Sequence, residues 1–346
     1  MKELIVVSGG TGYIGSHTAV ELMEEGYEVL IIDNLNNSRI EVLDGIQGIT
    51  GKRPHFEKLD LCDLQGTRDC FQKYPDIRAV IHFAAHKAVP ESVEKPLMYY
   101  ENNLLSLINL LNVMKEFKVE YFVFSSSSTV YGQPDKLPVT EQSTIKEANS
   151  PYGNTKQISE EIIRDSIKAG DPIRAISLRY FNPVGAHPTA LIGELPLGVP
   201  ENLVPFITQT AAGVREELKV FGNDYNTPDG SAIRDYINVV DLSRAHVVAI
   251  DRLLAKKNKT GFEIFNLGTG RGLSVLEVID AFVKATGVEF KYKVVGRREG
   301  DIEQVWADTT LANNELGWKA VIPLEETMKS AWNWERKFRA ENPNYV

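Results

Sequence analysis

A glycine-rich turn directly after a short apolar segment is the feature that most constrains the fold of this chain. The apolar run is Leu4–Val7, and Gly9, Gly12 and Gly15 follow it at the start of an amphipathic segment. Glycines in such a turn let the backbone approach a pyrophosphate, which the N–H groups at the start of the next helix can bind. A turn of this kind can also be purely structural, so the segments around it must show whether it binds a nucleotide.

The first half of the chain alternates apolar runs with amphipathic segments. The expected strands are Leu4–Val7, Val29–Ile32, Ala79–Phe83, Tyr121–Phe124 and Ile173–Leu178, and the expected helices include His17–Glu25, Leu104–Phe117 and Thr155–Ala169. Continuous apolar strands are typical of a parallel sheet that is buried on both faces. We therefore predict an α/β fold whose residues 1–182 form a Rossmann-type doubly wound parallel sheet.

The character of the chain changes after Asn182. Residues 183–232 are rich in Pro, Gly, Asn and Thr, with one clear helix near Asn202–Ala212. Alternation then resumes in Asp235–Val240, Leu242–Leu254 and Phe262–Leu267. We expect residues 183–346 to form a smaller C-terminal α/β lobe that binds substrate, with part of 235–270 rejoining the first sheet.

Charge and composition exclude several classes of protein. The net charge of −9 argues against binding nucleic acid or an acidic membrane surface, so an anionic ligand must be bound by a few placed Arg, Lys or backbone N–H groups. No apolar run approaches the roughly 18 residues of a membrane span. The chain has two cysteines, Cys62 and Cys70, and its histidines lack zinc-like spacing, so we expect a cytoplasmic protein without a metal site.

An acidic residue after the second strand sharpens the nucleotide prediction. Asp33 lies about 20 residues beyond the glycine turn, where a carboxylate accepts the adenosine ribose hydroxyls. No nearby Arg could accept a 2′-phosphate, since Arg39 lies beyond a turn, so NAD is expected rather than NADP. Asp60 could bind the adenine amino group or could equally serve as a helix N-cap.

Hydroxyl and amine side chains then appear where the strand order places the reaction centre. The run Ser125–Ser128 follows the fourth expected strand, and ligands bind outside the carboxyl ends of such strands. Tyr152 and Lys156 are four residues apart and share one helix face. Removing a hydride from an alcohol carbon needs a base for the hydroxyl proton, and a nearby ammonium favours the phenolate of a tyrosine. Tyr152 is thus the expected base, with Ser127 and Lys156 as its partners.

In these motifs the chain resembles the extended short-chain dehydrogenase/reductase superfamily and, within it, the UDP-galactose 4-epimerases. The resemblance runs nearly end to end, through Gly-Gly-Thr-Gly-Tyr-Ile-Gly-Ser-His (9–17), Asp-Asn-Leu (33–35), His-Phe-Ala-Ala-His-Lys-Ala-Val (82–89), the serine run, Ser-Pro-Tyr-Gly (150–153), Arg-Tyr-Phe-Asn-Pro-Val-Gly-Ala-His-Pro (179–188), Phe-Gly-Asn-Asp-Tyr (221–225), Arg-Asp-Tyr-Ile (234–237) and Arg-Arg-Glu-Gly-Asp (297–301). It implies an NAD-dependent interconversion of UDP-galactose and UDP-glucose through a 4-keto sugar. It also implies a homodimer formed through two helices of the first domain, although the apolar residues of Leu104–Leu111 fit a core helix equally well.

The resemblance also assigns site residues. The cofactor residues that it implies are Gly9, Gly12, Tyr13, Ile14, Gly15, Asp33, Asn34, Asn37, Ser38, Asp60, Leu61, Phe83, Ala84, Ala85, Lys87, Asn103, Tyr152, Lys156 and Tyr180. The UDP-sugar residues that it implies are Lys87, Ser127, Tyr152, Asn182, Asn202, Leu203, Phe221, Arg234, Arg298 and Asp301, with the two arginines on the pyrophosphate. Tyr152 is the implied base, Ser127 the proton shuttle and Lys156 the group that stabilises the phenolate.

Two residues depart from the pattern, and other activities remain as alternatives. Ser128 stands where relatives often carry Ala, and its hydroxyl could compete with that of Ser127. Val305 stands where stricter members carry a bulky aromatic residue, which leads to the hypothesis that N-acetylated UDP-hexosamines are also substrates. A 4,6-dehydratase is disfavoured because Ser128-Thr129 replaces the Asp-Glu pair typical of those enzymes. A uronate epimerase, or a non-catalytic NAD-sensing protein, is a weaker alternative.

Overall fold

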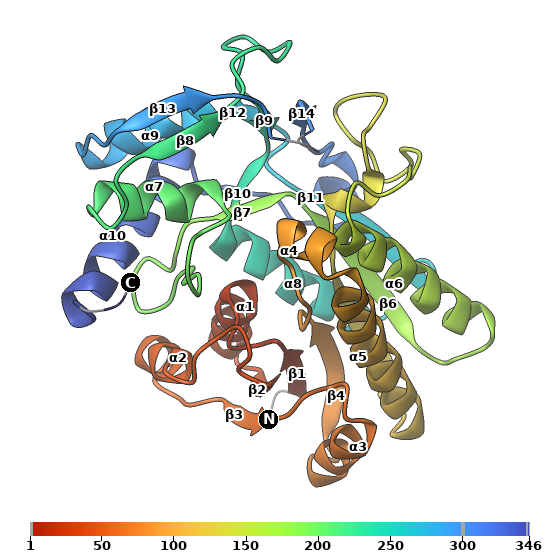
Figure 1. Ribbon diagram of the computed structural model, residues 1–346. Coiled ribbons are helices and arrows are strands. Elements are labelled where there is room, and N and C mark those ends of the chain that lie inside the picture. The colour runs from red at the N-terminus through yellow and green to blue at the C-terminus, as the bar shows by residue number, and fades with distance from the viewer. Residues whose placement is uncertain (1–2, 299–301, 344, 346) are drawn as a thin grey trace.

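The structure is a computed structural model that describes residues 3–298, 302–343 and 345. Within them a seven-stranded sheet has the order β11-β6-β5-β4-β1-β2-β3, and every pairing in it is parallel. The bounds of these strands are β1 Leu4–Ser8, β2 Glu28–Asp33, β3 His55–Lys58, β4 Ile77–His82, β5 Tyr121–Ser127, β6 Arg174–Tyr180 and β11 Phe262–Leu267. The predicted Rossmann-type fold is confirmed (Figure 1).

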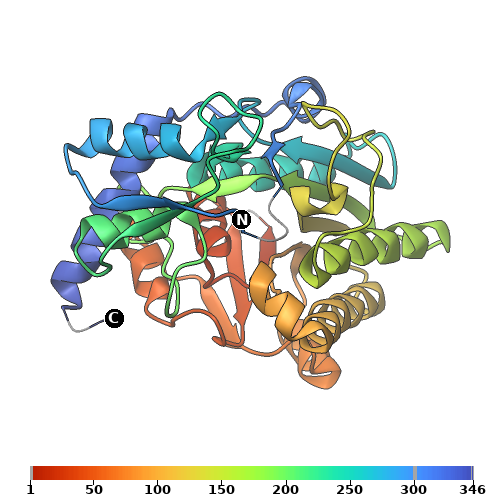
Figure 2. The same ribbon diagram turned by 45° about the horizontal axis from the view of Figure 1, so that its top comes forward.

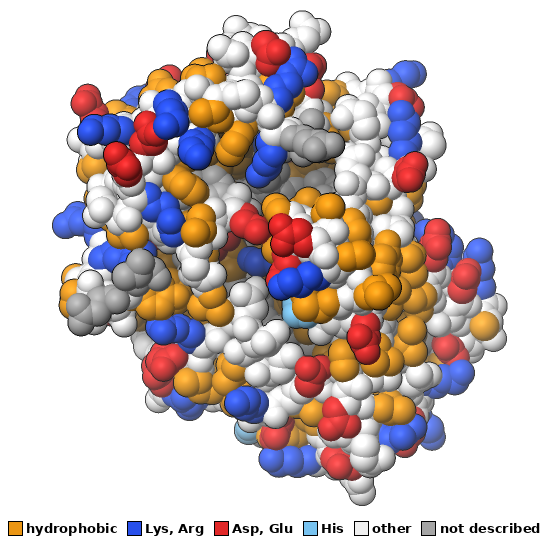
Figure 3. All heavy atoms as spheres, in the orientation of Figure 1, with side chains coloured by type: hydrophobic (Ala, Val, Ile, Leu, Met, Phe, Trp, Pro, Cys, Tyr) orange, Lys and Arg blue, Asp and Glu red, His pale blue; other side chains and the backbone are white. Residues whose placement is uncertain are grey.

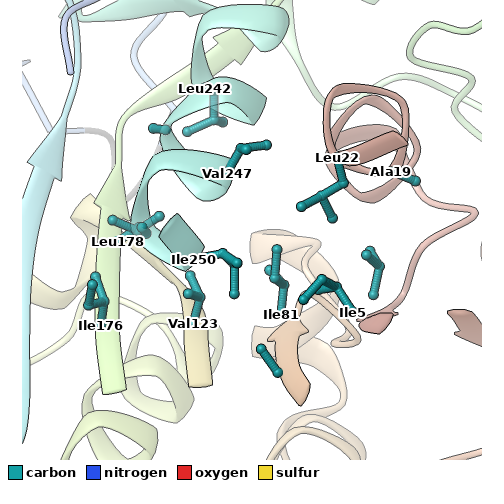
Figure 4. Close-up of a cluster of buried hydrophobic side chains, with 14 of the residues drawn as sticks. Ile5, Ala19, Leu22, Ile81, Val123, Ile176, Leu178, Leu242, Val247 and Ile250 are labelled. Atoms are coloured by element: carbon teal, nitrogen blue, oxygen red, sulfur yellow. The ribbon is translucent and has the colours of Figure 1, made fainter. Parts of the chain in front are cut away.

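Helices cover both faces of this sheet because its strands are apolar on both sides. One buried cluster joins the strands to α1 Tyr13–Glu24, α2 Val42–Thr50 and α8 Val239–Leu254. Figure 4 shows its centre, where Ile5, Ile81 and Val123 of the sheet lie opposite Leu22 of α1 and Ile250 of α8. The cluster on the other face joins the strands to α3 Leu64–Lys73, α5 Pro96–Glu116 and α6 Pro151–Lys168. The short helix α4 Val89–Glu94 precedes α5.

The remaining elements form a smaller lobe beside the carboxyl ends of the strands (Figures 1 and 2). Its helices are α7 Leu203–Ala211, α9 Val275–Thr286 and α10 Leu324–Glu341, and its short strands are β7 Asn182–Val184, β8 Leu218–Phe221, β9 Ile233–Arg234, β10 Tyr236–Asn238, β12 Leu273–Ser274, β13 Tyr292–Val295 and β14 Gln304–Val305. Helical turns η1 Ser128–Tyr131 and η2 Ala312–Leu316 complete the described elements. Segments distant in sequence pair here, such as β8 with β13 and β9 with β14.

The sequence prediction missed β3, α2, α3 and α4, because these elements are short and lack a continuous apolar run or a long amphipathic pattern. Strand β3 is an edge strand of four residues whose side chains are all at least partly exposed, so it has no continuous apolar run. Helices α2, α3 and α4 are short and lie on the surface. Strand β11 was not missed: it falls within the stretch 235–270 that we expected to rejoin the first sheet, and it pairs with β6 at the opposite edge. In the part of the chain that the structure describes, no helix is both long and apolar enough to cross a bilayer.

Candidate active site

The glycine turn is closely packed and has no room for side chains. Gly9 has a φ of +72°, and a Cβ atom there would lie 2.7 Å from the backbone nitrogen of Ala84. A Cβ on Gly15 would lie 2.3 Å from the carbonyl oxygen of Gly9. The turn leads into α1, whose N-cap residue, Gly12, makes no side-chain capping bond. The first N–H groups of α1 therefore lie behind a turn that an anion can approach closely.

The carboxylate of Asp33 lies at the end of β2 beside this turn. Its Oδ2 accepts a hydrogen bond from the backbone N–H of Thr11 at 3.1 Å, and its Oδ1 accepts from Leu35 N at 2.9 Å and from Ser38 Oγ at 3.1 Å. These bonds fix the carboxylate at the point where ribose hydroxyls are expected.

Asp60 is not a helix N-cap, because the N-cap of α3 is Asp63, whose side chain accepts a bond from Gly66 N. The Asp60 carboxylate instead accepts from Asn34 Nδ2 at 3.0 Å and from Cys62 N at 2.8 Å. Asp60 faces the same cavity as Asp33, which agrees with the predicted adenine contact without testing it.

A cavity of about 1240 Å³ runs from the glycine turn to the second lobe. Figure 3 shows the molecule hollowed between the two lobes, with acidic and basic side chains around the opening. The cavity brings together these predicted residues: Gly9, Gly12, Tyr13, Ile14, Gly15, Asp33, Asn34, Asn37, Ser38, Asp60, Leu61, Phe83, Ala84, Ala85, Lys87, Ser127, Tyr152, Lys156, Tyr180, Asn182, Asn202 and Arg234. Asn103, Leu203, Phe221 and Arg298 are not among the lining residues, and Asp301 lies outside the described residues.

The three predicted catalytic residues meet beside the glycine turn. Tyr152 and Lys156 occupy the first turns of α6, whose start is set by Ser150, the N-cap residue that accepts a hydrogen bond from Gly153 N at 3.2 Å. Ser127 is the last residue of β5, so the expected strand end at Phe124 was too early. The side chains of all three catalytic residues are nearly buried at the cavity wall.

The electrostatics of this group differ in one respect from the expectation. Burial raises the pKa of Tyr152 well above its usual range, and the hydrogen bond with Ser127 only partly opposes this. Burial also lowers the pKa of Lys156 to about 8, while the charge of Glu160 raises it. The ammonium of Lys156 lies 5.8 Å from the centre of the Tyr152 ring and donates to the carbonyl oxygen of Ser125 at 2.8 Å. The field of Lys156 by itself therefore does not overcome the desolvation of the phenol.

Asn103 holds the loop that carries Lys87. Its Oδ1 accepts from His86 N at 2.8 Å, and its Nδ2 donates to His86 O at 3.0 Å and to Thr155 Oγ1 at 3.2 Å. Since this amide is already bonded to the loop and to α6, Asn103 acts on the cavity through His86 and Lys87. Its predicted contact with the cofactor stays a prediction.

The second lobe supplies the other cavity wall. Asn182 begins β7, and the preceding strand β6 ends at Tyr180. Arg234 lies on β9 and donates to the carbonyl oxygen of Ile233 at 2.8 Å. The guanidinium of Arg298 lies 5.5 Å above the ring of Phe221, which is 37% exposed, so this pair forms a polar and aromatic surface near the cavity.

The cavity also contains polar side chains that were not predicted, and Glu194 is one of them. Glu194 lines the cavity, and its carboxylate accepts from Asn202 Nδ2 at 2.6 Å. Burial raises the pKa of Glu194, and the charge of Lys87 opposes the shift. Glu194 lies in an irregular segment rich in Pro and Gly, where no periodicity or motif marks it, so local sequence offers no signal for it.

The two departures noted in the sequence both face the cavity. Val305 is 6% exposed on β14 and packs with Val130, Tyr131 and Phe181 in a small apolar cluster. Ser128 lies in η1 next to Ser127. In the described part of the chain, His, Cys, Asp and Glu side chains form no group suited to a metal ion.

Comparison with known proteins adds to this geometry. A family model described as GDP-mannose 4,6 dehydratase matches residues 6–331. The UDP-glucose 4-epimerase of Homo sapiens is 48% identical over 343 residues, covering 97% of each chain, and that of Bacillus subtilis is 49% identical over 331 residues, covering 96% of each. A crystal structure of the UDP-glucose 4-epimerase of Stenotrophomonas maltophila, with bound NAD and formylated UDP-arabinopyranose, is 45% identical and superposes with a TM-score of 0.94 over 99% of this chain and 100% of that chain.

Proposed function

The chain belongs to the UDP-glucose 4-epimerase family, and on that premise we propose how its own residues divide the work of the reaction. The reaction is the NAD-dependent interconversion of UDP-galactose and UDP-glucose by transient oxidation at C4 of the sugar. The observation that carries our assignment is the meeting of Ser127, Tyr152 and Lys156 in the same cavity as the glycine turn. The family model is named for a dehydratase. We nevertheless favour the epimerase reaction, because Ser128-Thr129 offers no carboxylate for eliminating water.

Tyr152 is the base that takes the 4-hydroxyl proton of the sugar. Its phenol is buried at the cavity wall, and the hydroxyl of Ser127 is its hydrogen-bond partner, so Ser127 rather than Ser128 can pass the proton between sugar and phenol. Returning the proton after the 4-keto sugar has turned over uses the same two groups in reverse.

Positive charge must balance the cost of a buried phenolate. Lys156 supplies part of it from one turn further along α6. NAD, when bound, accepts the hydride from C4 and returns it to the opposite face, and its positively charged nicotinamide adds to the field of Lys156. The glycine turn, the start of α1 and the carboxylate of Asp33 fit this cofactor, since they offer a backbone that an anion can approach and an acceptor for ribose hydroxyls.

The second lobe holds the UDP part of the substrate. We assign Arg234, which lines the cavity, and Arg298 to the pyrophosphate, and the ring of Phe221 beneath Arg298 to the uracil. Firm binding of UDP leaves the hexose free to turn over. Asn182 and Asn202 line the same cavity, and we assign them to the sugar.

The direct test is to incubate the purified protein with UDP-galactose and no added cofactor. We expect UDP-glucose to form without net NADH, because the cofactor is regenerated in each cycle. Chromatography of the sugars and absorbance at the NADH band measure both quantities. A 4-keto-6-deoxy product, or no interconversion even with NAD supplied, would contradict the assignment.

A second substrate class follows from Val305. Its side chain is small, lines the cavity and packs beside Phe181, and we propose that an N-acetyl group is accommodated next to it. We expect slow conversion of UDP-N-acetylglucosamine, and loss of that activity alone in Val305→Tyr. Conversion of UDP-galactose is the control. Equal losses of both activities, or no turnover of the N-acetylated sugar at high enzyme concentration, would refute this specificity role.

Assembly and domain division are also proposals. Helix α5 buries Leu107, Leu110 and Leu111 in the core yet exposes Leu105 and Ile108 by 39% and 40%, and Leu97 at its start is 80% exposed. Val89 and Val93 of α4 continue this apolar face. The face supports a homodimer through α4 and α5, which light scattering of Leu97→Glu would test by loss of the dimer mass.

We further assign residues 1–182, together with α8 and β11, to the NAD-binding domain and the rest of 183–346 to the UDP-sugar lobe. The free thiols Cys62 and Cys70 suit a cytoplasmic location. Fractionation of the host cells would test this, and recovery of the protein outside the cytoplasm would overturn it.

A further inference from the structure

A charged pair lies buried near the catalytic residues and takes no part in the mechanism above. The side chains of Glu160 and Arg179 are each 1% exposed. The Glu160 carboxylate accepts hydrogen bonds from Arg179 Nε at 3.0 Å and Nη2 at 2.5 Å, and from Ser177 Oγ at 2.8 Å. Burying two charges is costly, and apolar residues of similar volume are often at least as stable. Stability alone therefore does not explain the pair.

The place of Glu160 on α6 links it to the active site. Tyr152, Lys156 and Glu160 follow one another at intervals of four residues, so they share one face of the helix. All three are buried on the side of α6 that faces the sheet. Glu160 lies one turn beyond Lys156, and its negative charge opposes the desolvation of the Lys156 ammonium.

Glu160 also holds the strand that carries the other active-site groups. Its carboxylate accepts a hydrogen bond from Ser126 Oγ at 2.7 Å. On one side of Ser126 is Ser125, whose carbonyl oxygen accepts from Lys156 Nζ at 2.8 Å. On the other side is Ser127, the proposed proton shuttle. The Glu160 carboxylate is thus bonded to Ser126, which lies between Ser125, the acceptor of Lys156, and Ser127, the proposed shuttle.

We propose that Glu160 is a positioning residue of the active site: paired with Arg179, its carboxylate holds the end of β5 in place and keeps Lys156 in its ammonium form. Arg179 has the opposite electrostatic effect on Lys156, and it lowers the pKa of Glu160 together with the hydrogen bonds from Ser126 and Ser177. Neither side chain lines the cavity, so both act through Lys156 and the serines.

The other groups around Lys156 do not replace this charge. On β4, burial and the charge of Lys156 lower the pKa of His82 to about 3, so its ring is neutral near pH 7. On β6, burial raises the pKa of Tyr180, so its phenol is also neutral. The phenol of Tyr152 is likewise protonated in the resting protein because burial raises its pKa. Glu160 is therefore a negative charge that faces the ammonium.

The test compares the two halves of the ion pair in the full-length enzyme. Glu160→Gln removes the negative charge, and the titration of Lys156 should move down by about one pH unit. Arg179→Met removes the positive charge, and the titration should move up, because Ser126 and Ser177 still bond the Glu160 carboxylate. NMR of the protein with isotope-labelled lysine measures this titration, with the Lys156 signal identified by its loss in Lys156→Met. The alkaline limb of the kcat profile for UDP-galactose should move in the same two directions.

A matched pair elsewhere supplies the control. Arg252 donates to Glu263 at 2.7 and 2.9 Å, and both side chains are 9% exposed, away from the cavity. Glu263→Gln and Arg252→Met should lower the unfolding midpoint without moving the Lys156 titration. Shifts of the same sign in Glu160→Gln and Arg179→Met, or no shift in either, would overturn the proposal. If Glu160→Gln does not fold, Arg179→Met carries the test, and an unmoved titration there is the refuting result.

The kinetic readout rests on the proposed function, whereas the NMR readout does not. A wild-type protein without epimerase activity would refute the function and still allow the Lys156 titration to be followed. An active wild type whose Lys156 titration ignores both substitutions would refute the positioning role alone.

Discussion

The two walls of the cavity are built in different ways. The nucleotide wall comes from β1, β2 and the turns after them: Gly9 and Gly15 follow β1, Asp33 ends the adjacent strand β2, and all three lie within 25 residues of sequence. The substrate wall brings together Asn182, Arg234 and Val305 from short strands that pair across long stretches of chain. The nucleotide wall is consequently a property of one local motif, while the substrate wall depends on the folding of the whole lobe. The proposed catalytic residues on β5 and α6 lie where the two walls meet.

Tyr152→Phe should have the largest effect, because it removes the hydroxyl of the proposed base, which lies between the two walls. We expect kcat to fall by roughly 10²–10⁴-fold, the range for loss of a positioned acid–base group. NAD content and UDP affinity should stay unchanged, since the ring still fills its place. Steady-state kinetics and calorimetry measure these quantities. A loss of less than tenfold would remove Tyr152 from the role of base.

Gly15→Ala should disable the nucleotide wall alone. Its Cβ would lie 2.3 Å from Gly9 O and 2.9 Å from Gly10 Cα, so the backbone of the turn must shift. We expect the purified protein to lose most of its NAD and about 1–3 kcal/mol of stability from overpacking, while binding of UDP persists. Gly296→Ala is the matched control, because its Cβ would meet no described atom within 4 Å. Normal NAD content in Gly15→Ala would show that the turn does not bind the cofactor.

Arg234→Leu should disable the substrate wall alone. Loss of hydrogen bonds between a guanidinium and the pyrophosphate should weaken UDP binding by about 1.5–3 kcal/mol, or roughly 10–100-fold. NAD content should not change, which is the converse of the result for Gly15→Ala. Calorimetry with UDP checks the affinity, and Arg336→Leu, at an exposed position on α10, is the control. Equal affinities in the two variants would place the pyrophosphate elsewhere.

Acid should destabilise the nucleotide domain through its buried histidines. Burial lowers the pKa of His17 to about 3, of His82 to about 3 and of His246 to about 4, and all three lie on elements of the main sheet or its covering helices. Because these values lie below the unfolded pKa of about 6.5, the neutral rings contribute stability that is complete above pH 6.5 and is lost as the pH falls toward the folded pKa. In that window, protonation of each histidine should lower the free energy of unfolding by up to about 1.4 kcal/mol per pH unit.

His246→Leu measures one such contribution. The ring packs 4.7 Å from the centre of the Phe83 ring, so an apolar replacement keeps part of the packing. Between pH 6 and 4.5 the free energy of unfolding, measured in urea, should fall less steeply in the variant than in the wild type. Parallel slopes for the two proteins would contradict the assignment of this acid sensitivity to His246.

The sequence predicted a strand accurately where its residues form a continuous apolar run, and less accurately where polar residues are buried. Strands β1, β2 and β4 are buried on both faces, so their apolar runs predicted them to within two residues. The end of β5 was placed three residues early because Ser125–Ser127 are polar. These serines are nevertheless buried, and their hydroxyls are hydrogen-bonded to Tyr180, Glu160 and Thr129 N. An apolar pattern cannot reveal a buried strand end made of bonded serines.

The sequence by itself determined the parallel sheet, the glycine turn with its acidic partner and the Tyr152–Lys156 spacing, because each depends on residues close together in the chain. Tertiary structure alone decided that Asn103 holds the loop of Lys87, that Glu194 enters the cavity and that Glu160 pairs with Arg179. Those contacts join residues whose local patterns carry no sign of one another. Their free energy arises only when packing removes both partners from water, so they appear in the folded protein and not in any short stretch of its sequence.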